Sequence, residues 1–258
     1  MSQVRQIRKL TLEQEPYLGV RSFATTYTTG HVIEPHTHSW VQLLYACSGA
    51  MTAQAGRWSW MVPPGRAVLI PAGCLHTIRM WGDVAMRSLA IPPDRIADRI
   101  DVHECRVLSV TPLLRELILR VIEMGALDSR VAEEARLLEV LFDEIAEAEI
   151  APLMLPLPVE PRALAVARHV LASPAEEETI DLLARRFGAG RRTLERLFRG
   201  ETGISFGMWR QKARMLESIR LLAEGKSVTE AALDTGYNSV SAFIAAFKTT
   251  FGCTPGRL

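Results

Sequence analysis

The stretch from Thr179 to Phe198, TIDLLARRFGAGRRTLERLF, carries two short apolar faces at helical spacing on either side of a glycine turn. The faces consist of Leu182, Leu183 and Phe187, then Leu194, Leu197 and Phe198, and four arginines surround the second face: Arg191, Arg192, Arg196 and Arg199. Glycine accepts the positive φ of a tight interhelical turn, so Gly188 and Gly190 predict two helices with a turn between them. A second helix that is cationic is typical of a helix-turn-helix with its recognition helix, although two solvated surface helices would show the same pattern.

The same pattern recurs 48 residues later, in the stretch from Val228 to Phe247, VTEAALDTGYNSVSAFIAAF. Gly188 aligns with Gly236, and one extra residue in the second turn aligns Phe198 with Phe247. A supersecondary unit that repeats at a fixed spacing indicates that the unit is used twice. Between the copies, residues 205–222 contain no proline and no glycine after position 207, which predicts one long helix holding the two units apart.

The last hundred residues are similar to the DNA-binding domain of the AraC/XylS family of bacterial transcription regulators. The resemblance rests on Arg192 to Phe198 (RTLERLF), Glu201-Thr202-Gly203, Trp209-Arg210, Thr235-Gly236-Tyr237 and Phe243 to Pro255. It implies that each unit places its second helix in a major groove of double-stranded promoter DNA. We therefore expect an all-α domain with two helix-turn-helix units at residues 162–258.

The resemblance also implies different contacts for the two recognition helices. In the first, Arg192, Glu195 and Arg196 occupy base-contacting positions, and arginine can donate to guanine O6 and N7. In the second, the base-facing positions are Val240, Ser241, Ile244 and Ala245, which can touch thymine methyl groups but make few hydrogen bonds. The expected DNA-binding residues are Arg191, Arg192, Thr193, Glu195, Arg196, Arg199, Asn238, Ser239, Val240, Ser241, Ile244 and Lys248.

Charge is distributed unevenly along the 258 residues, although the formal net charge is only +1. Residues 161–258 hold 15 Lys and Arg against 10 Asp and Glu, whereas residues 1–160 hold 15 against 19. A basic half joined to an acidic half fits a DNA-binding domain attached to a part that does not bind DNA. The four cysteines lack C-x-x-C spacing, and the chain has neither a long apolar run nor an apolar signal core near its start. We expect a cytoplasmic protein without a zinc finger, a disulfide framework or a membrane contact.

Residues 1–105 alternate short β-rich runs with Gly and Pro turns, which predicts a small antiparallel barrel. The expected strands are residues 20–32, 41–47, 51–54, 58–61, 67–70, 76–80 and 86–91. Two segments match the spacing of the two cupin motifs: Gly30-x5-His36-x-His38-x3-Gln42-x6-Gly49 and Gly65-x5-Pro71-x-Gly73-x2-His76. The fold expected for the whole chain is α+β, with a cupin-type barrel before the helical DNA-binding domain.

Within the barrel, His36 and His38 are two residues apart on a strand, so their side chains point the same way, and His76 can join them. Three imidazoles and the amide oxygen of Gln42 suit a divalent transition metal such as Ni, Zn, Co, Mn or Fe. The cupin motif has Glu in place of Gln42, which weakens such a site, so no cofactor is certain. Sensory cupins that resemble this one often bind organic ligands instead.

The alternative is therefore an effector pocket, because aromatic walls around a few polar groups are typical of small-molecule sites. Ordinary core or dimer packing would also account for each tryptophan. The expected pocket residues are His36, His38, Trp40, Gln42, Trp58, Trp60 and His76.

Residues 106–150 carry two apolar stripes at helical spacing, broken at residues 125–129. In regulators of the resembling family such helices pack on the barrel and pair two chains, so we expect a homodimer; an intramolecular helix pair is the alternative. Residues 151–161, APLMLPLPVEP, contain four prolines. Because proline cannot continue a helix, we place an extended linker and the domain boundary there.

These features together predict a transcription regulator whose barrel senses a small molecule. The phrases WVQLLYACSG and WMVPPGRAVLIPAG resemble regulators that control a neighbouring efflux transporter gene. One alternative is a metal-responsive regulator that uses His36, His38 and His76. A cupin metalloenzyme is a third, but Gln42 and the complete double helix-turn-helix argue against it, so we expect no enzyme and no catalytic residues.

Overall fold

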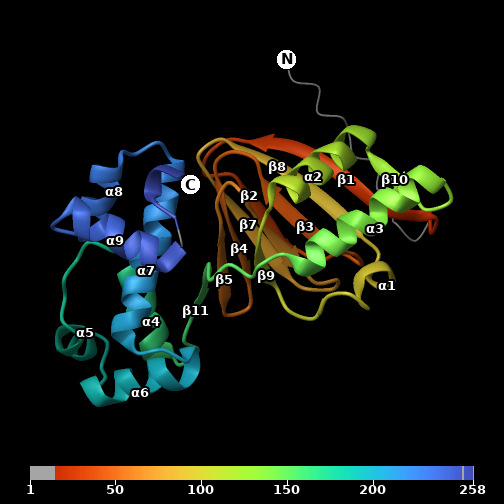
Figure 1. Ribbon diagram of the computed structural model, residues 1–258. Coiled ribbons are helices and arrows are strands. Elements are labelled where there is room, and N and C mark those ends of the chain that lie inside the picture. Colours follow the sequence, from red (N-terminus) through yellow and green to blue (C-terminus); the bar gives the residue numbers. More distant parts are fainter. Residues whose placement is uncertain (1–14, 252, 258) are drawn as a thin grey trace.

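Two antiparallel sheets form the N-terminal half of the computed structural model, which describes residues 15–251 and 253–257 (Figure 1). The first sheet has the order β10 (Ala126–Asp128), β1 (Leu18–Tyr27), β8 (Val84–Ile91), β3 (Val41–Ala46), β6 (Arg66–Ile70) and β9 (Arg106–Ser109). The second has the order β11 (Met154–Pro156), β5 (Trp58–Val62), β4 (Ala50–Ala55), β7 (His76–Trp81) and β2 (Val32–His36). The expectation of a β-rich N-terminal half is confirmed. The first 14 residues, which carry part of the expectation about a signal core, lie outside the described range.

Side chains alternate across the first sheet, and both of its faces are buried. On β3, Leu44 packs in the cluster between the two sheets with Met51 and Ile78, whereas Leu43 and Tyr45 pack in a second cluster on the other face. That outer face is covered by two helices, α2 (Pro112–Met124) and α3 (Ala132–Glu147). A strand covered on both sides is expected to be mostly apolar, and in VQLLYA of β3 Gln42 is the one polar residue.

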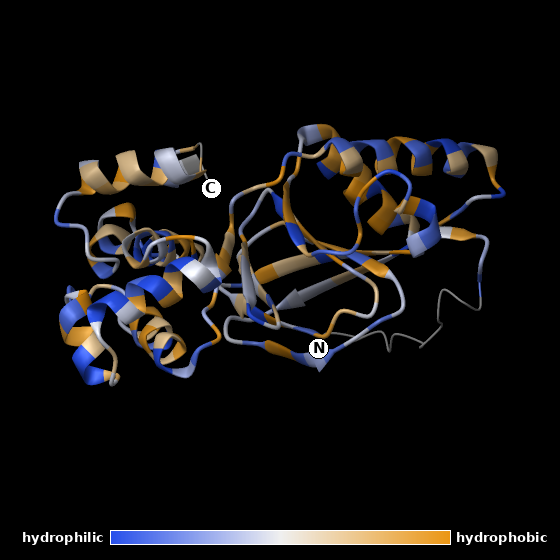
Figure 2. Cartoon of the chain, turned by 90° about the horizontal axis from the view of Figure 1, so that it is seen from below, coloured by the Kyte–Doolittle hydropathy of each residue, from blue (hydrophilic) through white to orange (hydrophobic). Residues whose placement is uncertain are grey.

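The two covering helices are amphipathic, as the alternating colours along them show in Figure 2. Leu114, Leu117 and Val121 of α2 are buried against the sheet, and α3 buries Leu138 and Phe142 in the same way. The two stripes expected from the sequence therefore belong to two helices on the barrel. A single-turn helix, α1 (Pro93–Ile96), precedes them.

The proline-rich stretch is part of the barrel and not a free spacer. Met154–Pro156 forms β11, which pairs with β5 at the edge of the second sheet. Leu153 and Leu155 are buried there. The indole Nε1 of Trp209 donates a hydrogen bond of 2.7 Å to the carbonyl oxygen of Pro156, so the same stretch also binds the helical half.

The C-terminal half is entirely helical. It contains α4 (Pro161–Ala172), α5 (Ile180–Arg186), α6 (Arg191–Thr202), α7 (Phe206–Ala223), α8 (Val228–Asp234), α9 (Val240–Phe251) and a 3-10 turn at Pro255–Arg257. The two expected helix pairs are α5–α6 and α8–α9, and the expected long helix is α7, capped by Ser205. Within the described residues, no helix combines the length and apolarity needed to cross a membrane.

The two halves share one apolar core. The cluster between the sheets continues through Leu155 into Trp209, Leu216 and Ile219 of α7. At the turn after β7, Gly82 has φ +69°, and a Cβ on it would lie 2.3 Å from the carbonyl oxygen of Ala223. Only glycine fits this contact, because the conformation is strained for other residues and the backbone atom cannot move aside.

Candidate DNA interface and sensor cavity

The first helix-turn-helix consists of α5 and α6. Leu183 of α5 packs with Leu194 and Phe198 of α6, which are fully buried, and Gly188 in the turn has φ +67°. Thr179 caps α5, because its hydroxyl accepts a hydrogen bond from the Leu182 amide. The start of α6 has no such partner, because Gly190 at the N-cap carries no side chain.

The outer face of α6 is cationic. Arg192, Arg196 and Arg199 are exposed, and within the described chain no carboxylate lies within 4.0 Å of their guanidinium nitrogens. Arg191 differs, because it pairs with Asp181 at 3.3 Å and with Glu195 at 3.2 Å. The three free guanidinium groups are therefore available to a polyanion, whereas Arg191 and Glu195 partly neutralise each other.

A cleft of about 600 Å³ runs between α6 and the first turn of α7. Its walls are Ile180, Arg191, Arg192, Glu195, Arg196, Arg199, Ser205, Phe206, Gly207 and Arg210. Thr193, the remaining expected contact residue of this helix, is half-buried. The cationic face thus extends from α6 onto α7, a continuity that fits a DNA backbone running past the helix.

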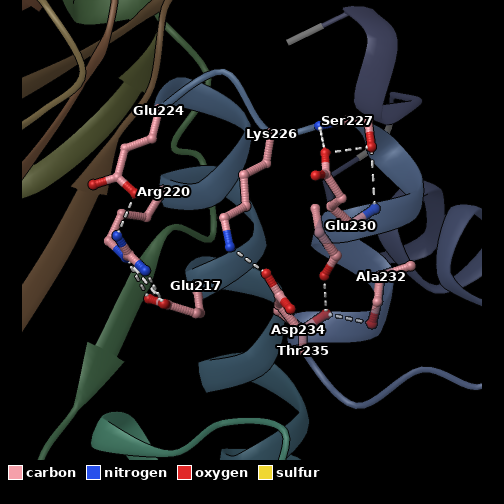
Figure 3. Close-up of polar contacts among 10 residues, drawn as sticks. Glu217, Arg220, Glu224, Lys226, Ser227, Glu230, Ala232, Asp234 and Thr235 are labelled. Atoms are coloured by element: carbon pink, nitrogen blue, oxygen red, sulfur yellow. Dashed lines mark hydrogen bonds and ion pairs between the residues drawn. The ribbon is translucent and has the colours of Figure 1, made fainter.

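The second helix-turn-helix consists of α8 and α9, and its first helix is firmly capped (Figure 3). The hydroxyl of Ser227 accepts from the Glu230 amide at 3.2 Å, and the Glu230 carboxylate accepts from the Ser227 amide at 2.8 Å. Lys226 pairs with Asp234, and the Thr235 hydroxyl donates to the Ala231 carbonyl oxygen at 2.6 Å. This reciprocal capping box fixes where α8 begins.

The outer face of α9 is short of polar groups. Ser241, Ala245 and Lys248 are exposed, whereas Val240 and Ile244 are half-buried and pack against the domain core. The hydroxyl of Ser239 accepts from the Ala242 amide at 3.4 Å, which caps the helix; the preceding residue, Asn238, is exposed. Of the expected contact residues of this unit, Val240 and Ile244 therefore offer less surface than the sequence suggested.

Three histidines gather inside the barrel. His36 and His76 lie opposite each other in the β2–β7 ladder with ring centroids 4.3 Å apart, and the His38 ring lies 5.0 Å from that of His76. Each Nδ1 is held by a backbone carbonyl oxygen: His36 by Glu34 at 2.9 Å, His38 by Trp40 at 2.7 Å and His76 by Cys74 at 3.0 Å. In the neutral ring this arrangement makes Nδ1 the donor and leaves Nε2 of His36 and His76 as the free lone pair, whereas Nε2 of His38 contacts Gln42.

Gln42 binds His38 and is not aimed at the centre of the cluster. Its amide lies 2.9 Å from His38 Nε2 on one side and 3.0 Å from the Ser88 hydroxyl on the other. Burial lowers the pKa of His38. The Gln42 amide oxygen is the atom that faces His38 Nε2, and the amide nitrogen donates to the Ser88 hydroxyl.

His76 is the most buried of the three histidines. Burial lowers its pKa to about 4, and its Nε2 has no hydrogen-bond partner in the described structure. Among the described residues, one group of three His, Cys, Asp or Glu side chains has ligand atoms that all lie within 4.8 Å of one another: His169, Glu176 and Glu178. In that group Arg186 already pairs with Glu178 at 2.7 Å. The barrel histidines therefore have suitable tautomers for a metal but do not converge on one point.

A separate cavity of about 650 Å³ opens on the second sheet. It is lined by Ala55, Gly56, Trp58, Trp60, Pro71, Ala72, Gly73, Cys74, Leu75, His103, Glu104, Cys105 and Met154; we call it the Trp58 cavity. Its lining includes strand β11, which leads to the helical half. Size and aromatic walls are those of a small-molecule site.

The rim of the Trp58 cavity touches the first recognition helix. Arg57, in the turn between β4 and β5, lies over the Trp58 ring at 4.6 Å, and its Nη1 donates to the Glu201 carbonyl oxygen of α6 at 3.1 Å. The Glu201 carboxylate in turn accepts from the Val159 amide at 2.7 Å. One side chain therefore links the cavity wall to α6.

The residues expected in one effector pocket lie in three places. Trp58 and Trp60 line the Trp58 cavity, and the three histidines with Gln42 form the cluster inside the barrel. Trp40 lines a third cleft, of about 220 Å³. Its ring stacks on the His38 ring of the cluster, with the ring centroids 5.0 Å apart. Sequence reasoning did not find Arg57, Cys74 or Cys105, whose contacts depend on tertiary pairing.

Comparison with known proteins gives matches along both halves. The family model of the AraC-like ligand binding domain matches residues 20–141, and that of a helix-turn-helix domain matches residues 183–258. The HTH-type transcriptional regulator NimR of Escherichia coli is 34% identical over 222 residues, which cover 86% of this chain and 80% of that protein.

Two further matches span most of the chain. The HTH-type transcriptional regulator RipA of Corynebacterium diphtheriae is 26% identical over 220 residues, which cover 85% of this chain and 60% of that protein. The crystal structure of wild-type ToxT from Vibrio cholerae with bound unsaturated fatty acid aligns over 92% of this chain and 94% of that one, with 12% identity and a TM-score of 0.40.

Proposed function

Because the chain belongs to the AraC family of transcription regulators, with a ligand-binding barrel and a double helix-turn-helix, we propose which parts carry each task. The recognition helices α6 and α9 bind promoter DNA in the bacterial cytoplasm, with most base reading by α6. The Trp58 cavity binds the effector. The relatives are transcription regulators, and we assign no catalysis to the chain.

The observation that supports this assignment is the contact of Arg57. A ligand that packs against Trp58 displaces or fixes the guanidinium stacked on that ring, and the same guanidinium binds the end of α6. A ligand can shift an equilibrium only through contacts that differ between two states. The Arg57–Glu201 bond is a contact that ligand binding at Trp58 can change.

The lining of the cavity limits the class of effector. Trp58, Trp60 and Met154 present apolar surface, and His103 and Glu104 supply polar atoms at the exposed side. Such a wall favours a flat, mainly apolar organic compound with few polar groups. A drug-like compound of this kind agrees with control of a neighbouring efflux transporter gene, which we keep as part of the proposal.

A thermal-shift screen of drug-like compounds on the full chain tests the assignment, because a true ligand raises the melting temperature by mass action. Trp58→Ala should abolish the shift, whereas Trp40→Ala, in a different cleft, should preserve it. Arg57→Ala should still bind the compound but lose its effect on DNA affinity. A compound that binds equally well to Trp58→Ala would show that the effector site lies elsewhere.

A metal-responsive regulator is the second candidate, favoured by the buried and unpartnered Nε2 of His76. His36, His38 and His76 would hold the ion, and their Nδ1–H groups, bound to carbonyls, are the usual support of metal-binding imidazoles. The nitrogens do not converge, and Gln42 occupies His38 Nε2. Binding a metal would therefore require the histidine rings to turn towards one point and the Gln42 side chain to move away from His38.

Metal content and promoter affinity separate the two candidates. Under the metal hypothesis His38→Ala abolishes binding of nickel, zinc, cobalt, manganese or iron, and Gln42→Glu tightens it by supplying a carboxylate. Bound metal should leave as pH falls from the ordinary histidine pKa of about 6.5 towards the value of about 4 at His76. Protein purified without a tag that holds no metal, and whose DNA affinity ignores all five ions, would exclude this function.

We also propose that the regulator is a homodimer paired through α2 and α3. Leu113 and Val140 are exposed on these helices, with 52% and 43% of their surface accessible. Analytical ultracentrifugation of wild type, Leu113→Glu and Val140→Glu tests this, with Leu171→Glu, on α4, as the control. A monomeric wild type would contradict it.

A further inference from the structure

Two cysteines meet in the wall of the Trp58 cavity. The Sγ atoms of Cys74 and Cys105 lie 3.9 Å apart, although the residues are 31 positions apart in the chain. Cys74 is in the turn after β6, and Cys105 directly precedes β9, which pairs with β6. The ladder places Leu69 opposite Arg106, so the two thiols project from the same end of one strand pair.

Both thiols are accessible from the cavity. Cys74 and Cys105 are half-buried and belong to its lining, and the neighbouring Leu75 is 61% exposed. Burial raises the pKa of the Cys105 thiol, with the nearby Cys74 as a second cause. Because Cys74 adjoins the exposed Leu75, it is the thiol that an incoming reagent meets first, and Cys105, with its Sγ 3.9 Å away, is positioned to react second.

We propose that Cys74 and Cys105 form a reversible intramolecular disulfide when a low-molecular-weight disulfide enters the Trp58 cavity. The Cys74 sulfur attacks the small disulfide, forming a mixed disulfide and releasing one thiol. The Cys105 sulfur then attacks Cys74 Sγ and releases the second thiol. The two cysteines lose two protons and two electrons in total, and the small disulfide is reduced to two thiols.

The new bond would alter the sensor at two points. Closing the sulfurs from 3.9 Å to a bond of about 2.05 Å would fasten the Cys74 turn to the start of β9. That turn holds His76 through the Cys74 carbonyl oxygen and is tied to the loop of His38, between β2 and β3, through the Gly73 amide, 2.8 Å from the His38 carbonyl oxygen. The disulfide would also narrow the cavity beside Trp58. An effect on DNA affinity rests on the proposed function of that cavity, whereas the disulfide itself does not.

Full-length protein treated with excess glutathione disulfide tests the chemistry. Two of the four thiols should become unreactive, digestion should give a cross-linked pair of peptides containing Cys74 and Cys105, and dithiothreitol should restore both thiols. Cys105→Ser should instead accumulate the glutathione adduct at Cys74. Cys47→Ser and Cys253→Ser are the matched controls and should cross-link as the wild type does.

Four unreacted thiols, a stable glutathione adduct in the wild type or a cross-link between chains would overturn the proposal. The consequence is measured separately on a DNA site that the reduced protein selects from a random pool. Oxidation should change the affinity of the wild type for this DNA by about fivefold or more, and it should leave the affinity of Cys105→Ser unchanged. If the disulfide forms without this change in affinity, only the link to DNA binding is overturned, and the disulfide proposal stands. The effect of a bound compound on the DNA affinity of reduced Arg57→Ala tests the proposed effector path separately.

Discussion

The two helix-turn-helix units share an interior and differ at the surface. Phe198 of α6 and Phe247 of α9 are both fully buried and both lie within 6 Å of two further aromatic rings. On the outside, α6 presents three arginines that have no acidic partner among the described residues, whereas α9 presents Ser241, Ala245 and Lys248. The units also differ in their helix caps: Gly190 gives α6 no side-chain cap, whereas α8 begins with the Ser227–Glu230 capping box.

This difference supports the proposal that α6 does most of the base reading on the DNA. Arginine discriminates among bases through paired hydrogen bonds, whereas small or apolar side chains fit the groove and touch methyl groups. The second unit is well fixed in structure, and under this proposal it carries little sequence information. A duplicated scaffold can therefore keep its packing while one copy reads the base sequence and the other adds affinity.

The largest effect should come from the shared interior. Phe198→Ala and Phe247→Ala should each lower the free energy of unfolding of the helical half by about 3–5 kcal/mol, because each leaves a cavity in a closely packed core. Urea denaturation followed by circular dichroism measures both. Losses that differ by more than about 2 kcal/mol would mean that the two scaffolds are not equivalent.

The arginines of α6 give the next effect. Arg196→Ala should lose about 1–3 kcal/mol on a selected site and little on random DNA, because it removes contacts to a base. Arg199→Ala should weaken both and reduce the salt dependence by about one counterion, as expected for a phosphate contact. Equal losses on both DNAs for Arg196→Ala would remove its base-reading role.

The DNA itself tests the comparison from the other side. Single base changes under α6 should cost about 1–3 kcal/mol each, and those under α9 should cost less, because Val240, Ile244 and Ala245 make few hydrogen bonds. Fluorescence anisotropy with a series of singly substituted sites measures this. A half-site under α9 that is as intolerant as the other would reverse the division of labour.

The smallest effect concerns the caps. Gly190 has φ −88°, and a Cβ there meets only Thr193 Oγ1 at 3.8 Å, so serine fits without strain. Gly190→Ser should stabilise the helical half by a few tenths of a kcal/mol, and Ser239→Gly should destabilise it by a similar amount. Thermal melts of both variants and of the wild type show the difference. A destabilising Gly190→Ser would mean that the bare cap serves another purpose.

Local periodicity predicted most of the fold. The two helix pairs, the long helix α7 and most strands of the barrel follow from spacings of three to four and of two residues, which the sequence carries directly. The expected strand at residues 20–32 was wrong in its bounds, because β1 ends at Tyr27 and β2 begins only at Val32. The histidine cluster was predicted from the two motifs, and the three rings do lie together. The expectation that His36 and His38 share one strand was wrong, because β2 ends at His36 and His38 lies in the loop that follows.

Contacts that depend on strand register were beyond the sequence. Cys74 and Cys105 meet because β6 pairs with β9, and Arg57 reaches α6 because the two halves pack together. No spacing in the chain encodes either contact. Strand β11 was hidden by its prolines, although Pro156 is compatible with an edge strand, where a missing amide costs no central ladder bond.

The position of β11 also bears on how such a regulator could be rebuilt. The proline-rich composition invites a cut near residue 150, with the helical half transplanted onto another sensor. That cut would strip the edge from the second sheet and leave the backbone of β5 open to pairing with other chains, a known route to aggregation. A chimera that keeps residues 151–157 with the barrel, and supplies the recipient helices with a carbonyl for the indole of Trp209, respects how this molecule is divided.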